Sequence, residues 1–273
     1  VGAINNKGLE ISLNADVIRT SKFQWTSDFN IGFNRNRVTE LYGGKPELKG
    51  LKRLEEGRDM DEWYLREWAG VDPANGSPLW YTTDENGKRT TTDSYNKADR
   101  VYCGSAAPKF TGGWMNSFSY KGFTLTANFD FVYGNLLYNQ SRELLDSDGA
   151  YADYNSMKLK SGWKRWEKEG DIATHPKAIN GGNKNSNKSS SRYLEKGNYF
   201  SLRNLSLGYS IPEKLCGKLG LQRVNVSCSA DNLFTLTPFS GVSPQLSDSS
   251  TDGYAGTIYP LSRRIVFGLN VSF

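Results

Sequence analysis

The chain has 273 residues, of which 37% are hydrophobic, 13% aromatic and 23% charged, with a mean hydropathy of −0.61. It contains no run of about 18 apolar residues, which excludes a transmembrane helix. The net charge of +5, from 34 basic and 29 acidic residues, is too small and too evenly spread to indicate nucleic-acid binding. The aromatic residues and the 28 glycines favour twisted, turn-rich β-structure over helices.

Apolar and polar residues alternate with a period of two along much of the chain. Every second residue is apolar from Leu9 to Val17, from Phe123 to Tyr133 and from Ile265 to Phe273. This period is typical of β-strands with one apolar and one polar face. The alternation predicts seven strands, at about residues 8–20, 22–38, 110–121, 123–138, 194–211, 222–236 and 259–273.

The predicted strands are long. Several run for ten or more residues, whereas soluble strands usually have about five or six and a tilted membrane-spanning strand needs about 9–11. Their polar faces are rich in Asn, Thr, Ser and Gly, as expected for a water-filled lumen. We therefore predict an all-β fold, an antiparallel transmembrane β-barrel segment. A large soluble β-sandwich or β-helix is the alternative.

The connections between these strands alternate between short and long. The short ones lie at Thr20–Ser21, Lys121–Gly122 and Pro212–Leu221, and the long ones at residues 39–109, 139–193 and 237–258. Outer-membrane barrels have short periplasmic turns and long extracellular loops, so we expect the C-terminus at the periplasmic side. Zero or two further crossings are expected within residues 39–109, where Trp63–Gly70 and Pro78–Thr83 are candidates for a hairpin.

Seven strands are too few to close a large barrel. An open sheet edge in lipid would leave backbone groups without hydrogen bonds, so further strands are required. The sequence starts at Val1 without a Met or a signal peptide and runs directly into a strand pattern. We therefore expect the other strands upstream in a longer chain, and further copies of this chain are the alternative source.

Several segments resemble, in their order and spacing, the carboxy-terminal part of the SusC/RagA family of TonB-dependent outer-membrane transporters from Bacteroidetes. The matching segments are Asn6–Glu10, Gly70–Pro73, Gly76–Tyr81, Gly112–Gly113, Asn116–Phe123, Ser191–Tyr199, Arg203–Tyr209, Pro212, Asp231–Thr235, Tyr259–Pro260 and Gly268–Phe273.

The resemblance implies a barrel of about 22 strands around an amino-terminal plug. Residues 1–273 would form the carboxy-terminal part of that barrel, without the plug domain. The family imports oligosaccharides and other large nutrients, including peptides, across the outer membrane. Its energy comes from the TonB complex, which would be contacted through the absent amino-terminal region, and a SusD-like surface lipoprotein is its partner.

The final strand has a pattern that resembles the signal read by the barrel-assembly machinery. Such a machinery recognises a free edge strand by strand addition, with alternate side chains filling pockets. The residues of this candidate signal are Phe267, Leu269, Val271 and Phe273.

Aromatic residues gather in the first two long loops. An aromatic ring can stack on the apolar C–H face of a sugar, so we interpret these residues as candidate substrate contacts. Packing within the loops, or against the lipoprotein, is the alternative. The candidates are Trp63, Tyr64, Trp68, Trp80, Tyr81, Trp163 and Trp166.

No catalytic or cofactor-binding motif occurs in the sequence. GxSxG, HExxH and Walker patterns are absent, and His175 is the single histidine. We therefore predict no enzyme activity, no catalytic residue and no cofactor. A non-transporting barrel, such as a passive pore or an adhesion protein, remains an alternative function. An outer-membrane enzyme would require residues from upstream.

One loop segment has a high density of carboxylates, with Asp146, Asp148 and nearby Asp153. These are candidate calcium ligands, although the spacing and the closing Glu of an EF-hand are missing. A turn with Asx hydrogen bonds is the simpler interpretation, and we predict no established metal site.

Overall fold

The computed structural model of the chain describes residues 2–246, 253–256 and 258–273. Residues 247–252 and 257, which belong to the predicted loop 237–258, lie outside the described residues. Among the described residues, no helix is long and apolar enough to cross a membrane. Strands make up 51% of the structure and helices 8%, which confirms the predicted all-β class.

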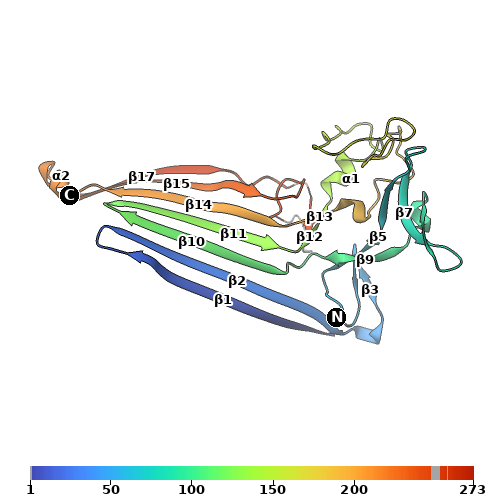
Figure 1. Cartoon of the computed structure of the whole chain (residues 1–273), viewed down its shortest axis with the longest axis horizontal. Coiled ribbons are helices and arrows are strands. Elements are labelled where there is room, and N and C mark those ends of the chain that lie inside the picture. Colours follow the sequence, from blue (N-terminus) through green and yellow to red (C-terminus); the bar gives the residue numbers. More distant parts are fainter. Residues whose placement is uncertain (1, 247–252, 257) are drawn as a thin grey trace.

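Seven long strands form one sheet in which every neighbouring pair is antiparallel and the order follows the chain (Figure 1). They are β1 (Ala3–Arg19), β2 (Phe23–Glu40), β10 (Phe110–Tyr120), β11 (Phe123–Tyr133), β14 (Tyr199–Ser210), β15 (Arg223–Leu236) and β17 (Arg264–Ser272). The three short connections and the C-terminus lie at one end of the sheet, and the long loops gather at the other. The seven predicted strands and the alternation of their connections are confirmed.

Three predicted boundaries differ from the observed ones. The strand predicted over residues 123–138 divides into β11 and β12 (Leu136–Asn139), and the one over 194–211 divides into β13 (Leu194–Lys196) and β14. Gly134 causes the first break, because its φ of +90° suits glycine and its N–H donates to Asn198 Oδ1 at 2.7 Å. The last strand begins at Arg264 rather than at residue 259.

The apolar rows of all seven strands meet on one face, which we call the apolar face. One row across the sheet consists of Leu13, Phe29, Trp114, Phe129, Leu202 and Phe234. The rings are in contact, with centroids 5.7 Å apart for Trp114–Phe129 and 5.2 Å for Phe129–Phe200. Cross-strand aromatic pairs of this kind stabilise a sheet in a single register.

The opposite face, which we call the polar face, carries small and polar side chains. A row next to the one above consists of Ser12, Asn30, Gly113, Asp130, Ser201 and Thr235. A shift of one residue in any strand would exchange its polar and apolar rows, so the register is strongly specified. β-Bulges correct the alternation locally: one in β1 brings Ile18, rather than Val17, opposite Trp25.

Ser27 and Asn116 are polar side chains among the aromatic residues of the apolar face, and both are hydrogen-bonded to indole groups. Trp25 Nε1 donates to Asn116 Oδ1 at 3.0 Å, and Trp114 Nε1 donates to Ser27 Oγ at 2.9 Å. An amide or hydroxyl without a partner is costly in an apolar environment. These bonds therefore allow Ser27 and Asn116 to occupy an otherwise apolar surface.

The long loops contain small sheets of their own. Residues 39–109 form β3 (Glu47–Lys49), β4 (Lys52–Leu54), β5 (Glu62–Arg66) and β9 (Arg100–Ser105) in one sheet, and β6 (Trp68–Val71), β7 (Pro78–Thr83) and β8 (Arg89–Thr92) in another. None of these strands joins the long sheet, so this loop adds zero crossings. The candidate hairpin is present in part: β6 pairs with β7, whereas residues 63–66 belong to β5, which pairs with β4 and β9.

The other short elements also lie outside the long sheet. β12 pairs with β13 and, in parallel, with β16 (Tyr254–Ala255). The helical elements are α1 (Ser141–Leu145), α2 (Glu213–Lys218) and the 3-10 turns Tyr42–Gly44, Tyr95–Lys97 and Ser191–Tyr193.

Replacing Phe129 with Lys tests which face contacts lipid. Phe129 lies at the middle of β11 on the apolar face, and its neighbour Asn128 lies on the polar face. A Lys at the centre of a lipid-facing surface costs about 2–4 kcal/mol, so we expect a loss of that size in the free energy of unfolding of the full-length protein in bilayers. Asn128→Lys is the control and should have a much smaller effect. Equal effects of the two substitutions would contradict the assignment.

Candidate functional site

Three of the seven candidate aromatic residues are buried within the loops. Trp63 is 0% exposed and its Nε1 donates to the carbonyl of Leu136 at 3.0 Å. Trp80 is also fully covered, and Trp166 donates to the carbonyl of Pro73 at 3.0 Å. Their ring faces are covered in this structure, so we propose no stacking contact for these three residues. Trp63 belongs to a hydrophobic core with Leu65, Ala106, Tyr138 and Tyr193.

The other four candidates are partly exposed and each lies next to a cation. The guanidinium of Arg53 is 4.8 Å from the ring centre of Tyr64, and that of Arg192 is 5.0 Å from Trp68. Arg89 is 3.8 Å from Tyr81, and Arg142 is 4.4 Å from Trp163. These cation–π contacts occupy part of each ring and fix its orientation. Tyr64, Trp68, Tyr81 and Trp163 remain candidate contacts for a bound molecule.

Asp146 and Asp148 are fully buried in an ionic cluster. Asp148 accepts hydrogen bonds from Arg165 Nη1 at 2.7 Å, from Ser186 Oγ at 2.7 Å and from both terminal nitrogens of Arg192. This bidentate contact is the strongest geometry for an Arg–carboxylate pair.

Asp146 is held in the same cluster. It accepts a hydrogen bond from Arg142 Nη2 at 2.8 Å and is 2.9 Å from His175 Nε2. Burial of Asp146 opposes its ionisation, but the hydrogen bond with His175 and the positive charges of Arg192 and Arg142 outweigh it and lower its pKa.

These contacts give Asp146, Asp148 and His175 structural roles. The carboxylates of Asp146 and Asp148 face guanidinium groups, which would repel a cation, and Asp153 is exposed. In the part of the chain that the structure describes, no three His, Cys, Asp or Glu side chains are arranged to hold a metal. His175 is almost fully buried, between Asp146 and Thr174.

Backbone and side-chain hydrogen bonds next to the cluster fasten the first two long loops to each other. Arg66 and Ser190 form a β-bridge, and the backbone N–H of Trp68 donates to Ser191 Oγ at 2.9 Å. Asn183 Nδ2 donates to the carbonyl of Gly76 at 3.2 Å. Two loops that are distant in sequence therefore form one packed layer at the loop end of the sheet.

A polar pocket of about 390 Å³ lies under this layer. Asn34, Val132 and Tyr199 continue the polar rows of β2, β11 and β14 into it. Asn36, Asp61, Asn135 and Gln245 also line it. Asn135 is 7% exposed, and its Oδ1 and the Nε2 of Gln245 have no hydrogen-bond partner within the described residues. Unpaired amide groups of this kind can bind a neutral molecule that offers hydroxyl or amide groups.

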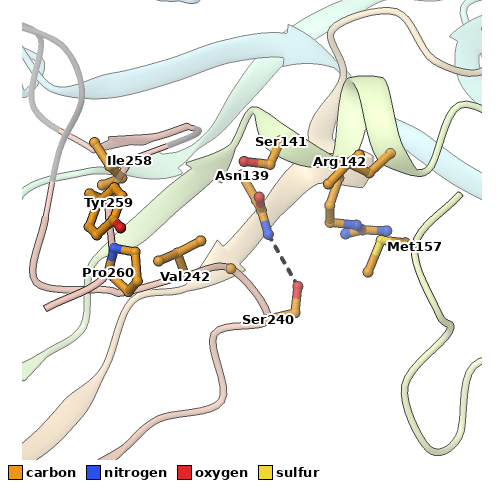
Figure 2. Close-up of a pocket in the computed structure, with 11 residues that line it drawn as sticks. Asn139, Ser141, Arg142, Met157, Ser240, Val242, Ile258, Tyr259 and Pro260 are labelled. Atoms are coloured by element: carbon orange, nitrogen blue, oxygen red, sulfur yellow. Dashed lines mark hydrogen bonds between the residues drawn. The ribbon is translucent and has the colours of Figure 1, made fainter. Parts of the chain in front are cut away.

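A second cavity, of about 510 Å³, is mainly apolar (Figure 2). Its apolar lining consists of Leu145, Met157, Val242, Ile258, Tyr259 and Pro260. Asn139 forms part of its wall and donates through Nδ2 to Ser240 Oγ at 3.1 Å, the dashed line in Figure 2. This cavity is suited to an apolar side chain rather than to a sugar.

Sequence reasoning did not identify the polar pocket. Its asparagines come from segments that are far apart in the chain, such as Asn34 and Asn135. The one local signal is the clustering of Asn at the loop ends of the long strands, seen in residues 30–36.

No family model matches the chain. All of it aligns, over 325 positions at 28% identity, with TonB-dependent receptor P39 of Formosa agariphila, and over 298 positions at 22% identity with the TonB-dependent receptor SusC of Bacteroides thetaiotaomicron. The solved structure of the RagAB peptide transporter covers 99% of the chain with a TM-score of 0.83 and 26% identity. The chain is similar throughout to SusC/RagA-type TonB-dependent receptors.

The chain spans only part of these relatives. It covers 31% of receptor P39, 27% of SusC and 29% of the matched RagAB chain. The RagAB peptide importer in its open-open state matches equally well, with a TM-score of 0.82 and 25% identity. The predicted resemblance to SusC/RagA proteins is confirmed, and with it the assignment of the sheet to an outer-membrane β-barrel.

The role of the ionic cluster is tested by replacing Arg192 with Met. Removing one partner of a buried ion pair costs about 3–5 kcal/mol, because the other charge stays buried. We expect faster amide hydrogen exchange in residues 66–80 and 183–192 of the SusC/RagA-like loops, with unchanged exchange in β10 and β11. Arg89→Met is the matched control, because the Arg89–Glu67 pair is exposed and worth at most about 1 kcal/mol. Equal exchange in both variants would show that the cluster does not hold the loops.

Proposed function

We propose that the chain is the carboxy-terminal barrel part of a TonB-dependent outer-membrane importer for oligosaccharides or other large nutrients, such as peptides. The observation that carries this proposal is the long sheet itself. Its strand order, its single apolar face and its alternating short and long connections fit a membrane barrel, and its similarity to SusC/RagA-type receptors extends over the whole chain.

The outer strands of the sheet support the proposal that more strands complete the barrel. β1 and β17 each have one neighbour in the sheet, so each has one edge that does not pair with another strand of the long sheet. In lipid these backbone groups need partners. We assign the missing strands, the plug and the TonB-contacting segment to a longer chain, and we expect a barrel of about 22 strands with the C-terminus at the periplasmic side.

The polar pocket and the partly exposed aromatic residues are the proposed contacts for the imported molecule. Asn135 and Gln245 offer unpaired amide groups, and Trp163 and Tyr81 offer partly covered rings. These groups suit a neutral polar molecule and fit a glycan or a peptide equally. The similar RagAB protein is described as a peptide transporter. The proposal includes no catalytic step and no cofactor.

The loop layer is the proposed contact surface for a SusD-like lipoprotein. The RagAB and SusC relatives favour such a pairing. The apolar cavity next to Tyr259, which is 92% exposed, is a suitable place for an apolar side chain of that partner.

Uptake in cells tests the proposal against a passive pore or an adhesion protein. We expect cells with the full-length protein to take up its nutrient only when TonB is functional, because the plug must be displaced with external energy. Growth on a panel of purified glycans and peptides, with and without TonB, is the measurement. Growth that is independent of TonB would favour the pore, and growth that is unaffected by deletion of the protein would exclude an importer.

Deleting Phe273 tests the proposed assembly signal. Phe273 follows the edge strand β17, and a completed barrel should tolerate its loss, since even a fully buried Phe contributes about 1.5–3 kcal/mol. Recognition during assembly depends on the last side chains of the strand, so we expect a low yield of folded protein with near-normal stability. Heat-modifiability on gels measures both. A normal yield would assign Phe273 to the strand end alone.

A further inference from the structure

The end of the sheet opposite the loops carries exposed basic and exposed apolar side chains. We call it the short-turn rim and define it as residues 19–22, residues 120–123, residues 212–223 with helix α2, and Phe273. Figure 1 shows α2 and the C-terminus together at this end. The rim is continuous with the apolar face, because Phe123, Tyr209 and Val226 form the apolar row next to it.

The rim has an excess of exposed positive charge. Within the described residues its five exposed basic side chains form no ion pairs: they are Lys22, Lys121, Lys214, Lys218 and Arg223. A sixth, Arg19, pairs with Asp16 at 3.3 Å, and Glu213 is the one acidic residue in the rim.

Basic residues at the loop end are arranged differently. Several exposed cations there have acidic partners, including Arg58 with Glu62 at 3.1 Å and Arg89 with Glu67 at 2.9 Å. Other loop cations are exposed and without ion pairs, but the six basic residues and one acidic residue of the rim give it a charge of +5, which equals the net charge of the whole chain.

Apolar side chains project from the same rim. Leu219 is 76% exposed and Phe273 is 83% exposed, and Leu215 is also exposed one helical turn before Leu219. Tyr120 and Phe123 flank the turn at Lys121, whose Nζ is 5.2 Å from the centre of the Tyr120 ring. Aromatic residues next to Lys are typical of the level at which a membrane protein meets lipid headgroups.

Helix α2 is fixed to the sheet rather than free. It packs against β15, and Cys216 is buried with its thiol directed at the carbonyl of Ile211. Val224 is 9% exposed, whereas Val226, the next residue in the same apolar row, is 45% exposed. The sheet therefore holds the exposed Leu and Lys side chains of α2 at a defined position relative to the apolar face.

We propose that the short-turn rim binds the headgroups of anionic phospholipids. The apolar face is surrounded by acyl chains, so the rim next to it lies at the membrane surface. There Leu215, Leu219 and Phe273 enter the acyl boundary while the basic side chains reach phosphate groups. Each Lys at such a surface changes the affinity by about fivefold. This inference goes beyond import and does not depend on it.

Lipid retention by the full-length protein tests the proposal without a transport assay. The protein is reconstituted in equal amounts of phosphatidylglycerol and phosphatidylcholine, extracted, and the lipids that stay bound are quantified by mass spectrometry. We expect enrichment of phosphatidylglycerol that decreases as salt is raised, because salt screens exposed charges. Equal retention of the two lipids at low salt would overturn the proposal.

Two matched variants locate the site. Replacing Lys22, Lys121, Lys214 and Lys218 together with Gln should reduce the enrichment by at least about fivefold. The control replaces the exposed loop residues Lys45, Lys49, Lys88 and Lys97 with Gln and should leave it unchanged. Rim variants with Arg in place of Lys should keep the preference for phosphatidylglycerol over phosphatidylcholine. Equal loss in the rim and loop variants would also overturn the proposal, and the salt response of the unmodified protein decides the matter if the rim variant does not fold.

Discussion

The structure depends on one constraint: in lipid, every backbone N–H and C=O group must find its hydrogen-bond partner within the protein. Long antiparallel strands in chain order meet this constraint, because β2, β10, β11, β14 and β15 are each paired on both sides. Tight turns keep neighbouring strands in register. At Lys121–Gly122 both residues have positive φ, 46° and 85°, which joins Tyr120 directly to Phe123 in a two-residue hairpin.

Once the backbone hydrogen bonds are made, the side chains decide which face of the sheet contacts lipid and which contacts water. The apolar face is continuous from Leu13 to Phe234 because the cross-strand partners have the same character. On the polar face, Gly208 and Gly268 lie on either side of Ser227, and a side chain at Gly268 would come within 2.5 Å of its hydroxyl. The sheet thus combines a smooth outer surface with a polar inner one.

The loops follow a different physical rule from the sheet. They are surrounded by water, so they need an internal core, and Trp63, Trp80 and Tyr193 supply it. The buried cluster around Asp146 and Asp148 holds the second loop together, and its Arg192 lies against the ring of Trp68 in the first loop. Because this layer is packed and cross-linked, the polar pocket beneath it has defined walls.

The strands could be predicted from the sequence because a period of two is a local signal that ten residues are enough to establish. The burial and the partners of the loop side chains could not be predicted in this way. Whether Trp63 is exposed depends on Leu136 and Tyr138, more than 70 residues away, and the sequence gives only the residue type. Asp148 has the composition of a metal ligand, yet its partner Arg192 is 44 residues further along. The polar pocket likewise depends on Asn34 and Asn135 meeting in space.

The central claim is that the apolar face of the long sheet contacts lipid and the polar face contacts water. Spin labels placed one at a time along β11, from Leu125 to Phe131 in the full-length protein in bilayers, test it most directly. The account predicts that labels at positions 125, 127, 129 and 131 are relaxed by oxygen dissolved in the lipid. Labels at 126, 128 and 130 should instead be relaxed by a water-soluble nickel complex. The reverse pattern, or equal accessibility at all positions, would contradict the account.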